Sequence, residues 1–80
     1  MQQEERISVT VNFDAQGGTV TPTQKQVKYG ETYGELPTPT KAGYKFIRWY
    51  NGSYGTVTEN TEVTNSKEHT LFAEWQEIWI

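Results

Sequence analysis

Apolar and polar residues alternate without a break over residues 7–13, and this period of two is typical of a strand with one buried face. The apolar positions of this run, which we expect to point into the core, are Ile7, Val9, Val11 and Phe13. Residues 14–18 then read Asp-Ala-Gln-Gly-Gly, which suits a hairpin loop because glycine accepts positive φ and Asp starts turns. A returning strand is therefore predicted from Thr19.

The next segment, residues 19–29, is rich in Thr and Val but contains Pro22. Proline has no N–H to donate to a neighbouring strand, so it is confined to edges, bulges and strand breaks. We expect strand pairing to be interrupted near Pro22 and to resume around residues 26–28.

Residues 30–36 carry glycines four positions apart and place Tyr33 three residues before Leu36. This spacing suits a single helical turn that caps the open side of the sheet, and the segment is too short for a longer helix. Prolines at positions 37 and 39 then favour an extended connector through residue 42, because each proline fixes its own φ and disfavours helical geometry in the residue before it.

The densest aromatic run reads Gly-Tyr-Lys-Phe-Ile-Arg-Trp-Tyr from position 43 and is predicted to form the central strand. Tyr44 and Phe46 fall on one face of a regular strand, whereas Ile47 and Trp49 are out of phase with them. A regular pleat cannot bury both pairs on one face. We therefore predict a bulge or twist near Ile47 and Arg48, or a strand that is covered on both sides.

Three further elements follow this strand. Residues 51–55 begin with Asn-Gly, a strong hairpin signal, and residues 56–58 predict a weak strand. The last strong strand is predicted over residues 69–75. The apolar residues that share one face of this strand are Leu71, Ala73 and Trp75.

The composition fits one small domain that is held together by large aromatic anchors. The 80 residues include three Trp, five Tyr and three Phe but no Cys, so disulfides and thiolate metal sites contribute nothing. With several strands and a single helical turn, the predicted fold class is α+β, mostly β: one small sheet with one short helical turn.

The charge pattern and the lack of a long apolar run argue against two classes of partner. The formal net charge is -3, and the Lys and Arg residues are scattered, so the basic stripe of a nucleic-acid-binding protein is missing. No apolar run approaches the ~20 residues that span a bilayer. We expect neither nucleic-acid binding nor membrane insertion.

No constellation of residues suggests catalysis. His69 is the only histidine, so a His-based metal site or a catalytic triad would lack a second partner. Calcium needs about six to eight oxygen ligands, and the EF-hand loop pattern is absent. Glu31 and Glu35 sit in a solvated acidic turn with nothing to mark a cleft. We therefore predict that the protein is not an enzyme and holds no metal or cofactor.

Aromatic residues outside the core are the remaining candidates for binding. Protein interfaces favour Trp, Tyr and Arg at their energetic centres, and aromatic rings also stack on sugars. The candidate partner-binding residues are Arg48, Tyr50, Tyr54, Tyr33 and Trp79. A protein-interaction domain and a small carbohydrate-binding domain therefore remain alternatives. The edge strands of so small a sheet also offer weak homodimerisation by strand addition.

Three ordered blocks of the sequence resemble a known family. They are residues 11–20 (VNFDAQGGTV), 43–50 (GYKFIRWY) and 69–75 (HTLFAEW). In this order and spacing the blocks resemble the Listeria-Bacteroides repeat, also called the internalin B-repeat, over about residues 7–75. The family pattern has Gly where this chain has Arg48, and more often Asn where it has Gln16.

The resemblance implies a compact β-grasp-like module, related in shape to ubiquitin-like domains, without catalytic or metal-binding residues. It also implies repeated copies in secreted or wall-anchored bacterial surface proteins, where such modules serve as spacers and as sites of protein interaction. We therefore expect an extracellular location at the cell surface or cell wall, with a host protein or a neighbouring surface domain as partner. The expected organisation is a domain over residues 7–75, a disordered leader over residues 1–6 and an apolar tail or linker over residues 76–80.

Overall fold

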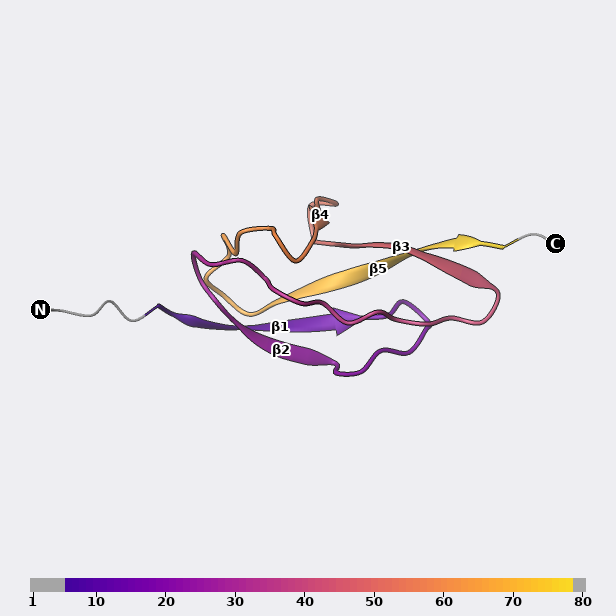
Figure 1. Ribbon diagram of the computed structural model, residues 1–80, viewed down its shortest axis with the longest axis horizontal. Coiled ribbons are helices and arrows are strands. Elements are labelled where there is room, and N and C mark those ends of the chain that lie inside the picture. Colours follow the sequence, from indigo (N-terminus) through magenta and orange to yellow (C-terminus); the bar gives the residue numbers. More distant parts are fainter. Residues whose placement is uncertain (1–5, 79–80) are drawn as a thin grey trace, which may run out of the picture.

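The computed structural model describes residues 6–78, and their regular structure is entirely β (Figure 1). The strands are β1 (Ser8–Asp14), β2 (Gln24–Lys28), β3 (Tyr44–Tyr50), β4 (Thr56–Val57) and β5 (His69–Glu77). They form one mixed sheet of five strands in the order β2-β1-β5-β3-β4. The expected leader, apart from Arg6, and the tail residues 79–80 lie outside the described part of the chain.

Strand β5 lies at the centre of the sheet and joins its two halves. It pairs in parallel with β1 over residues 69–72 and antiparallel with β3 over residues 72–77. On the outer sides, β2 pairs antiparallel with β1, and β4 pairs antiparallel with β3. The sheet therefore has two different edges, five residues of β2 and only two residues of β4.

The core lies against one face of the sheet, which we call the covered face. Its buried residues are Val9, Val11, Phe13, Val27, Tyr33, Trp49, Val57, Val63, Leu71 and Ala73. Two connections pack over this face, residues 29–43 through Tyr33 and residues 58–68 through Val63 (Figure 1). Side chains on the opposite face, such as Gln26, stay half-exposed or exposed, and we call it the open face.

The burial of β1 follows its alternating pattern from the second residue of the strand onward. Val9, Val11 and Phe13 are buried, as the sequence predicts. The expectation for Ile7 is wrong, because this residue precedes the strand and is 56% exposed. It lies at the end of the sheet, where its carbonyl accepts a hydrogen bond from Tyr29 N at 2.9 Å.

The predicted helical turn over residues 30–36 is wrong, because the backbone of this segment bonds to a distant part of the chain. Gly30 N donates to Val63 O at 2.9 Å, and Val63 N donates back to Glu31 O at 2.7 Å. The φ angles of Gly30 and Gly34 are +89° and +73°, outside the range of a right-handed helix. Long-range pairing therefore replaces the local bonds that a helix requires.

The loop after β1 also differs from the prediction, because the chain does not return as a strand at Thr19. Thr19 instead forms an isolated bridge with Thr40, with N–H···O distances of 2.8 and 2.9 Å. A Cβ atom on Gly18 would collide with Thr40 O, so this contact requires glycine. Strand β2 begins only at Gln24, which confirms the predicted interruption at Pro22.

Strand β3 resolves its phase conflict with a bulge, which confirms the prediction. The pairing register with β5 shifts between Phe46 and Arg48, so Ile47 is an extra residue and stays 43% exposed. The extra residue resets the alternation and brings the Phe46 and Trp49 rings to a centroid distance of 5.6 Å on the covered face. Arg48 and Tyr50 consequently point to the open face.

Candidate functional site

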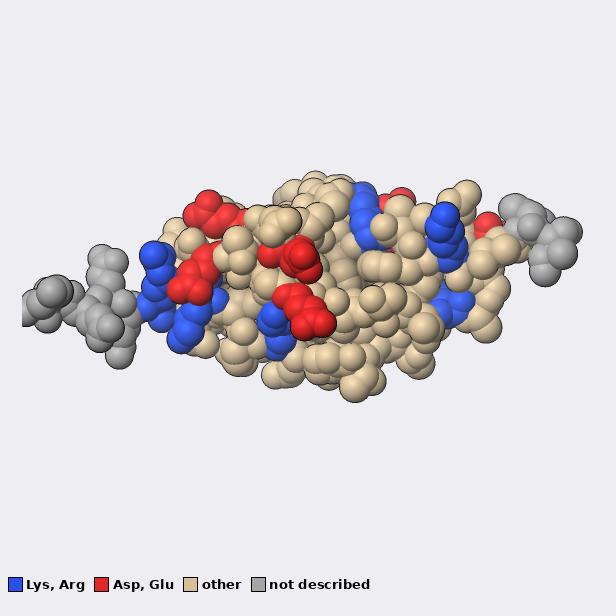
Figure 2. All heavy atoms as spheres, viewed as in Figure 1, with Lys and Arg blue, Asp and Glu red and all other residues tan. Residues whose placement is uncertain are grey.

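The exposed aromatic side chains are the strongest candidates for a binding site. Among residues 6–78, no group of three or more His, Cys, Asp or Glu residues is placed to hold a metal ion. No helix in this part of the chain is long and apolar enough to cross a membrane. On the face that Figure 2 shows, Lys and Arg side chains are interspersed with Asp and Glu and form no basic stripe.

Three aromatic rings lie side by side on the open face, and we call them the aromatic row: Tyr54, Tyr50 and Phe72. The Tyr54 and Tyr50 rings are 5.6 Å apart at 17°, and the Tyr50 and Phe72 rings are 5.7 Å apart at 33°. Tyr50 and Phe72 are directly opposed in the β3–β5 pair, and their neighbours Trp49 and Ala73 face the core. The row therefore faces outward, and Tyr54 is 73% exposed.

The turn between β3 and β4 holds Tyr54 in a fixed and strained position. Asn51 Oδ1 accepts hydrogen bonds from Ser53 N and Gly55 N at 2.9 Å each, and Tyr54 N donates to Asn51 O at 2.9 Å. The φ angle of Tyr54 is +66°, in the left-handed region that residues with side chains seldom adopt. Strain of this kind is concentrated at functional sites.

Arg48 braces this turn from the neighbouring strand. Its Nε pairs with Glu74 on β5. Its Nη1 donates to Tyr54 O at 3.0 Å and to Thr56 Oγ1 at 2.7 Å. The guanidinium carbon lies 5.1 Å from the centroid of the Tyr50 ring, within cation–π range. Arg48 therefore connects β3, β5 and the turn.

The structure brings together three of the five predicted binding residues. Those that meet at the β3–β4 turn are Arg48, Tyr50 and Tyr54. Tyr33 lies in the core at 5% exposure, and its hydroxyl is 2.8 Å from Nε2 of His69. Burial raises the pKa of Tyr33 above its ordinary value. Trp79 lies outside the described residues.

Two hollows flank the turn and share a wall, and together we call them the turn groove. The shared wall consists of Asn51, Gly52 and Phe72. The first hollow, about 300 Å³, adds Gln16, Tyr50 and Tyr54. The second, about 500 Å³, extends to His69 and Thr70, and the predicted binding residue Tyr33 also lines it although it is 5% exposed. The second hollow exists because β3 ends at Tyr50 while β5 extends back to His69, so β3 does not flank the first residues of β5.

Sequence reasoning missed Phe72, Asn51 and Gln16 as members of the site. Phe72 offered a usable signal, because it is a large apolar residue out of phase with the core residues Leu71 and Ala73. Asn51 and Gln16 offered none, since each is sufficiently explained as a turn residue. Only the fold brings Gln16 Nε2 to within 2.9 Å of the Tyr50 hydroxyl.

The opposite edge of the sheet, β2, presents backbone rather than aromatic side chains. At its two ends, Phe13 N donates to Thr23 O at 2.8 Å and Tyr29 N donates to Ile7 O at 2.9 Å. Backbone groups alternate in direction along an antiparallel strand, so the even-numbered residues between these bonds direct theirs away from β1. These residues are Gln24, Gln26 and Lys28.

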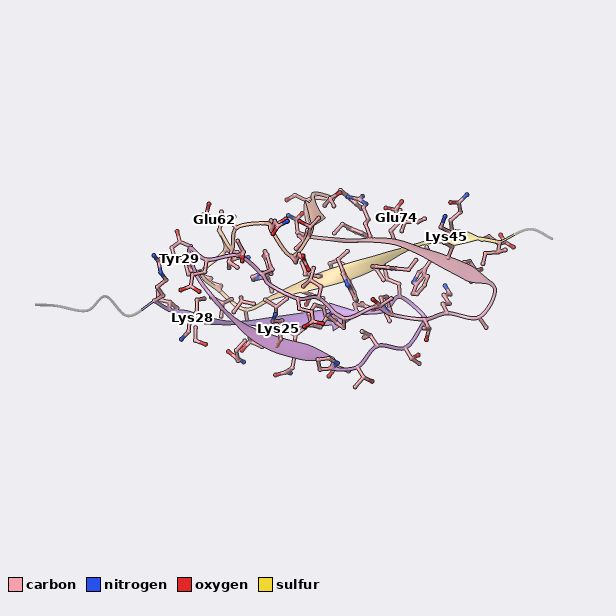
Figure 3. All side chains as sticks on the ribbon, in the orientation of Figure 1. Lys25, Lys28, Tyr29, Lys45, Glu62 and Glu74 are labelled. Carbon is pink, nitrogen blue, oxygen red and sulfur yellow. The ribbon has the colours of Figure 1, made fainter. Side chains whose placement is uncertain are left out.

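A third hollow of about 350 Å³ lies beside β2. The apolar residues that line it are Pro22, Leu36 and Pro37. Lys25 also lines it, and its Nζ donates to the carbonyl oxygens of Tyr33 at 2.8 Å and Glu35 at 2.9 Å. These bonds hold the connection against β2, where Figure 3 shows Lys25 and Lys28.

The chain was compared with families and with individual proteins. The Listeria-Bacteroides repeat domain matches residues 10–74, a range that includes part of β1, all of β2, β3 and β4, and most of β5. A comparison with curated proteins found no match. The family consists of repeat modules that are typical of bacterial surface proteins and are generally non-catalytic. Because the match covers most of the chain and agrees with the three sequence blocks, the chain belongs to the Listeria-Bacteroides repeat domain family.

Proposed function

We propose that this chain is a non-catalytic module of a bacterial cell-surface protein, located outside the cell, where it acts as a spacer and a protein-interaction domain. The observation that carries the proposal is the family match over residues 10–74, which takes in nearly the whole sheet. The parent gene provides the test. Neighbouring copies of the module and a wall anchor are expected, and a single cytosolic reading frame would contradict the proposal.

The strand order supports a β-grasp-like arrangement for this module. The order β2-β1-β5-β3-β4 places the parallel β1–β5 pair at the centre, with an antiparallel pair on either side. An irregular connection over residues 29–43 crosses the covered face, where a β-grasp domain carries its helix (Figure 1). We therefore propose that this module is a helix-free variant of that arrangement over residues 6–78.

The direction of the central strands supports the spacer role. Strands β1 and β5 run in parallel, and β5 continues beyond β1, so the start of β1 and the end of β5 lie at opposite ends of the sheet (Figure 1). Tandem copies would join end to end, and tension would load the β1–β5 hydrogen bonds together. Single-molecule pulling should therefore give a higher unfolding force through the two ends of the domain than through Ser8 and His69, and equal forces would contradict this role.

The β2 edge supports interaction with a protein partner by strand addition. The outward backbone groups of Gln24 and Gln26 are placed for pairing with an extended segment, whereas Lys28 O already accepts a hydrogen bond from Glu31 N at 3.0 Å. The hollow beside Leu36 offers a place for an apolar side chain of the added strand. A second copy would pair only weakly at this edge, because two five-residue strands bury far less than the ~1,200 Å² of a stable interface.

Replacing Gln26 with proline tests strand addition. The substitution removes an N–H that points away from β1, and Gln26→Thr is the control because it keeps this N–H. Sedimentation should show weak self-association of the wild type and Gln26→Thr, and its loss in Gln26→Pro. A monomer mass that is independent of concentration in all three proteins would contradict self-association at this edge.

A further inference from the structure

We propose that the turn groove is a binding site for a neutral oligosaccharide, one ring of which stacks on Tyr54. This proposal goes beyond the spacer and strand-addition roles, because it uses side chains at the β3–β4 turn and not the backbone of β2. The chemical class of the ligand follows from three features of the groove: the exposed ring, its rigid support and its mostly neutral lining.

Tyr54 offers a flat apolar surface with a polar rim. One face of its ring stacks on Tyr50, and the large exposure of Tyr54 leaves the other face accessible. A pyranose ring has a face of C–H groups edged by hydroxyls, so it matches a phenol that is apolar on its face and polar at its edge. Phe72 extends the same apolar character along the wall of the groove.

The support of Tyr54 reduces the conformational entropy that binding would cost. Asn51 fixes the turn through its side-chain oxygen, and Arg48 holds the carbonyl oxygen of Tyr54 at 3.0 Å. A tyrosine has only two side-chain torsions, and an aromatic anchor held in place before binding loses little freedom. The positive φ of Tyr54 is the strain that accompanies this placement.

Among the described residues, no Asp, Glu, Lys or Arg lines the groove, and His69 is the one basic side chain in its lining. The amide and hydroxyl side chains that line it are Gln16, Asn51, Ser53, Thr64, Asn65 and Thr70. Amides and hydroxyls both donate and accept hydrogen bonds, as sugar hydroxyls do. Arg48 lies beside Tyr50 but is paired with Glu74 and is absent from the lining, so a phosphate, a uronic acid or a strongly charged peptide would find no Lys or Arg there, whereas a neutral glycan needs none.

The dimensions of the groove suit more than one sugar ring. Its two hollows, of about 300 and 500 Å³, lie within the ~300–1,000 Å³ range of small-molecule sites. They meet at Gly52, where an added Cβ would have no atom within 4 Å. A linear chain laid across Gly52 would place consecutive rings in the two hollows.

Two substitutions test the site while sparing the core. Tyr54→Gly removes the ring and suits the positive φ at this position. Gly52→Leu adds bulk where the structure leaves open space. Tyr29→Ala is the matched control, because it removes another exposed tyrosine that lies beside β2.

Binding is measured by NMR titration of the full chain with neutral oligomers of glucose, mannose, galactose and N-acetylglucosamine, and with a galacturonic acid oligomer as the charged comparison. At least one neutral series should give saturable shifts at the backbone amides of residues 50–55 and 69–72. Each groove variant should bind about tenfold more weakly. Tyr29→Ala should bind as the wild type does, and added salt should leave the affinity unchanged.

Three results would overturn the proposal: no shift at these amides with any neutral series, wild-type affinity in both groove variants, or tighter and salt-sensitive binding of the charged oligomer. Shifts at the same amides with a protein from the same cell surface, and none with glycans, would assign the groove to a protein and also overturn it. None of these results involves the β2 edge. The proposed spacer and strand-addition role would therefore stand if this site failed.

Discussion

The two faces of the sheet use aromatic residues for opposite purposes, although the residues are neighbours in the sequence. On the covered face, the centroid of the Trp49 ring lies 5.1 Å from that of Phe13, in tilted geometry, and 5.6 Å from that of Phe46, in edge-on geometry. On the open face, Tyr50, the next residue along β3, stacks nearly parallel to Tyr54. One cluster joins the strands to the covering connections, and the other presents a ring to solvent.

The difference follows from what covers each ring. Trp49 is only 3% exposed, and its Nε1 donates to Pro37 O at 2.9 Å, so the whole side chain is buried with its polar atom satisfied. Tyr54 is held mainly through its backbone and by one face of its ring, and most of its apolar area remains in water. Burial converts aromatic area into stability, whereas exposed aromatic area remains available to a ligand.

The largest expected effect is on the covered face. Trp49→Ala should destabilise the domain by about 3–5 kcal/mol, a large fraction of the stability of a small domain, because it empties the centre of the aromatic cluster. Ile47→Ala is the control on the same strand, since this bulge residue is 43% exposed and lies outside the core. Thermal unfolding measures both variants. A Trp49→Ala protein with the melting temperature of the wild type would show that the aromatic cluster does not stabilise the fold.

A smaller loss is expected on the open face from Arg48→Ala. This change removes a hydrogen bond to Tyr54 in the turn, another to Thr56 of β4 and a partly exposed ion pair with Glu74, so it should cost about 1–2 kcal/mol. Hydrogen exchange should also become faster at the amides of Tyr54 and Gly55, because the turn loses its brace. Lys45→Ala removes a charge from the same strand, and equal exchange in the two variants would argue against a bracing role.

High pH should weaken the covered face through Tyr33. Burial raises the pKa of Tyr33 above its ordinary value of 10.0, so folding favours the neutral phenol. The stability that this group contributes is fully present below about pH 10 and is lost as the pH rises through the folded pKa. The denaturant midpoint should therefore fall more steeply with alkaline pH in the wild type than in Tyr33→Phe. Equal slopes in the two proteins would show that ionisation of Tyr33 does not cause the loss of stability at alkaline pH.

The smallest effect on stability is expected from Tyr54→Gly. Relief of the positive φ offsets the lost ring stacking and the added freedom of glycine, so the net change should stay within about 1 kcal/mol. Chemical denaturation measures it. A loss as large as that of Trp49→Ala would mean that the two faces do not differ in the way described above.

Local features of the sequence are sufficient to predict most of the strands and the bulge in β3. The alternation in β1 and the break at Pro22 are properties of the chain itself, and β1 and β2 follow them. The conflict between Phe46 and Trp49 is a matter of strand period, so its solution near Ile47 is predictable without a partner strand.

The remaining features depend on residues that are far apart in the sequence. The glycine spacing of residues 30–36 suggests a helical turn, but the preference of so short a segment is weak beside backbone pairing with residues 59–63. The aromatic row likewise requires the β3–β5 register, because this register places Phe72 opposite Tyr50. Neither the pairing of residues 30–36 with residues 59–63 nor the β3–β5 register can be predicted from local composition or hydrophobic period.

The sequence by itself determined which residues alternate, where the chain must bend, and to which family it belongs. Only the tertiary structure decided which aromatic rings are covered. Tyr33 and Tyr54 both lie in turn-rich segments with glycine neighbours, yet one is buried and the other is largely exposed. The reason is physical: burial depends on which distant segment packs over a ring, and that packing is set by long-range backbone pairing that no local pattern encodes.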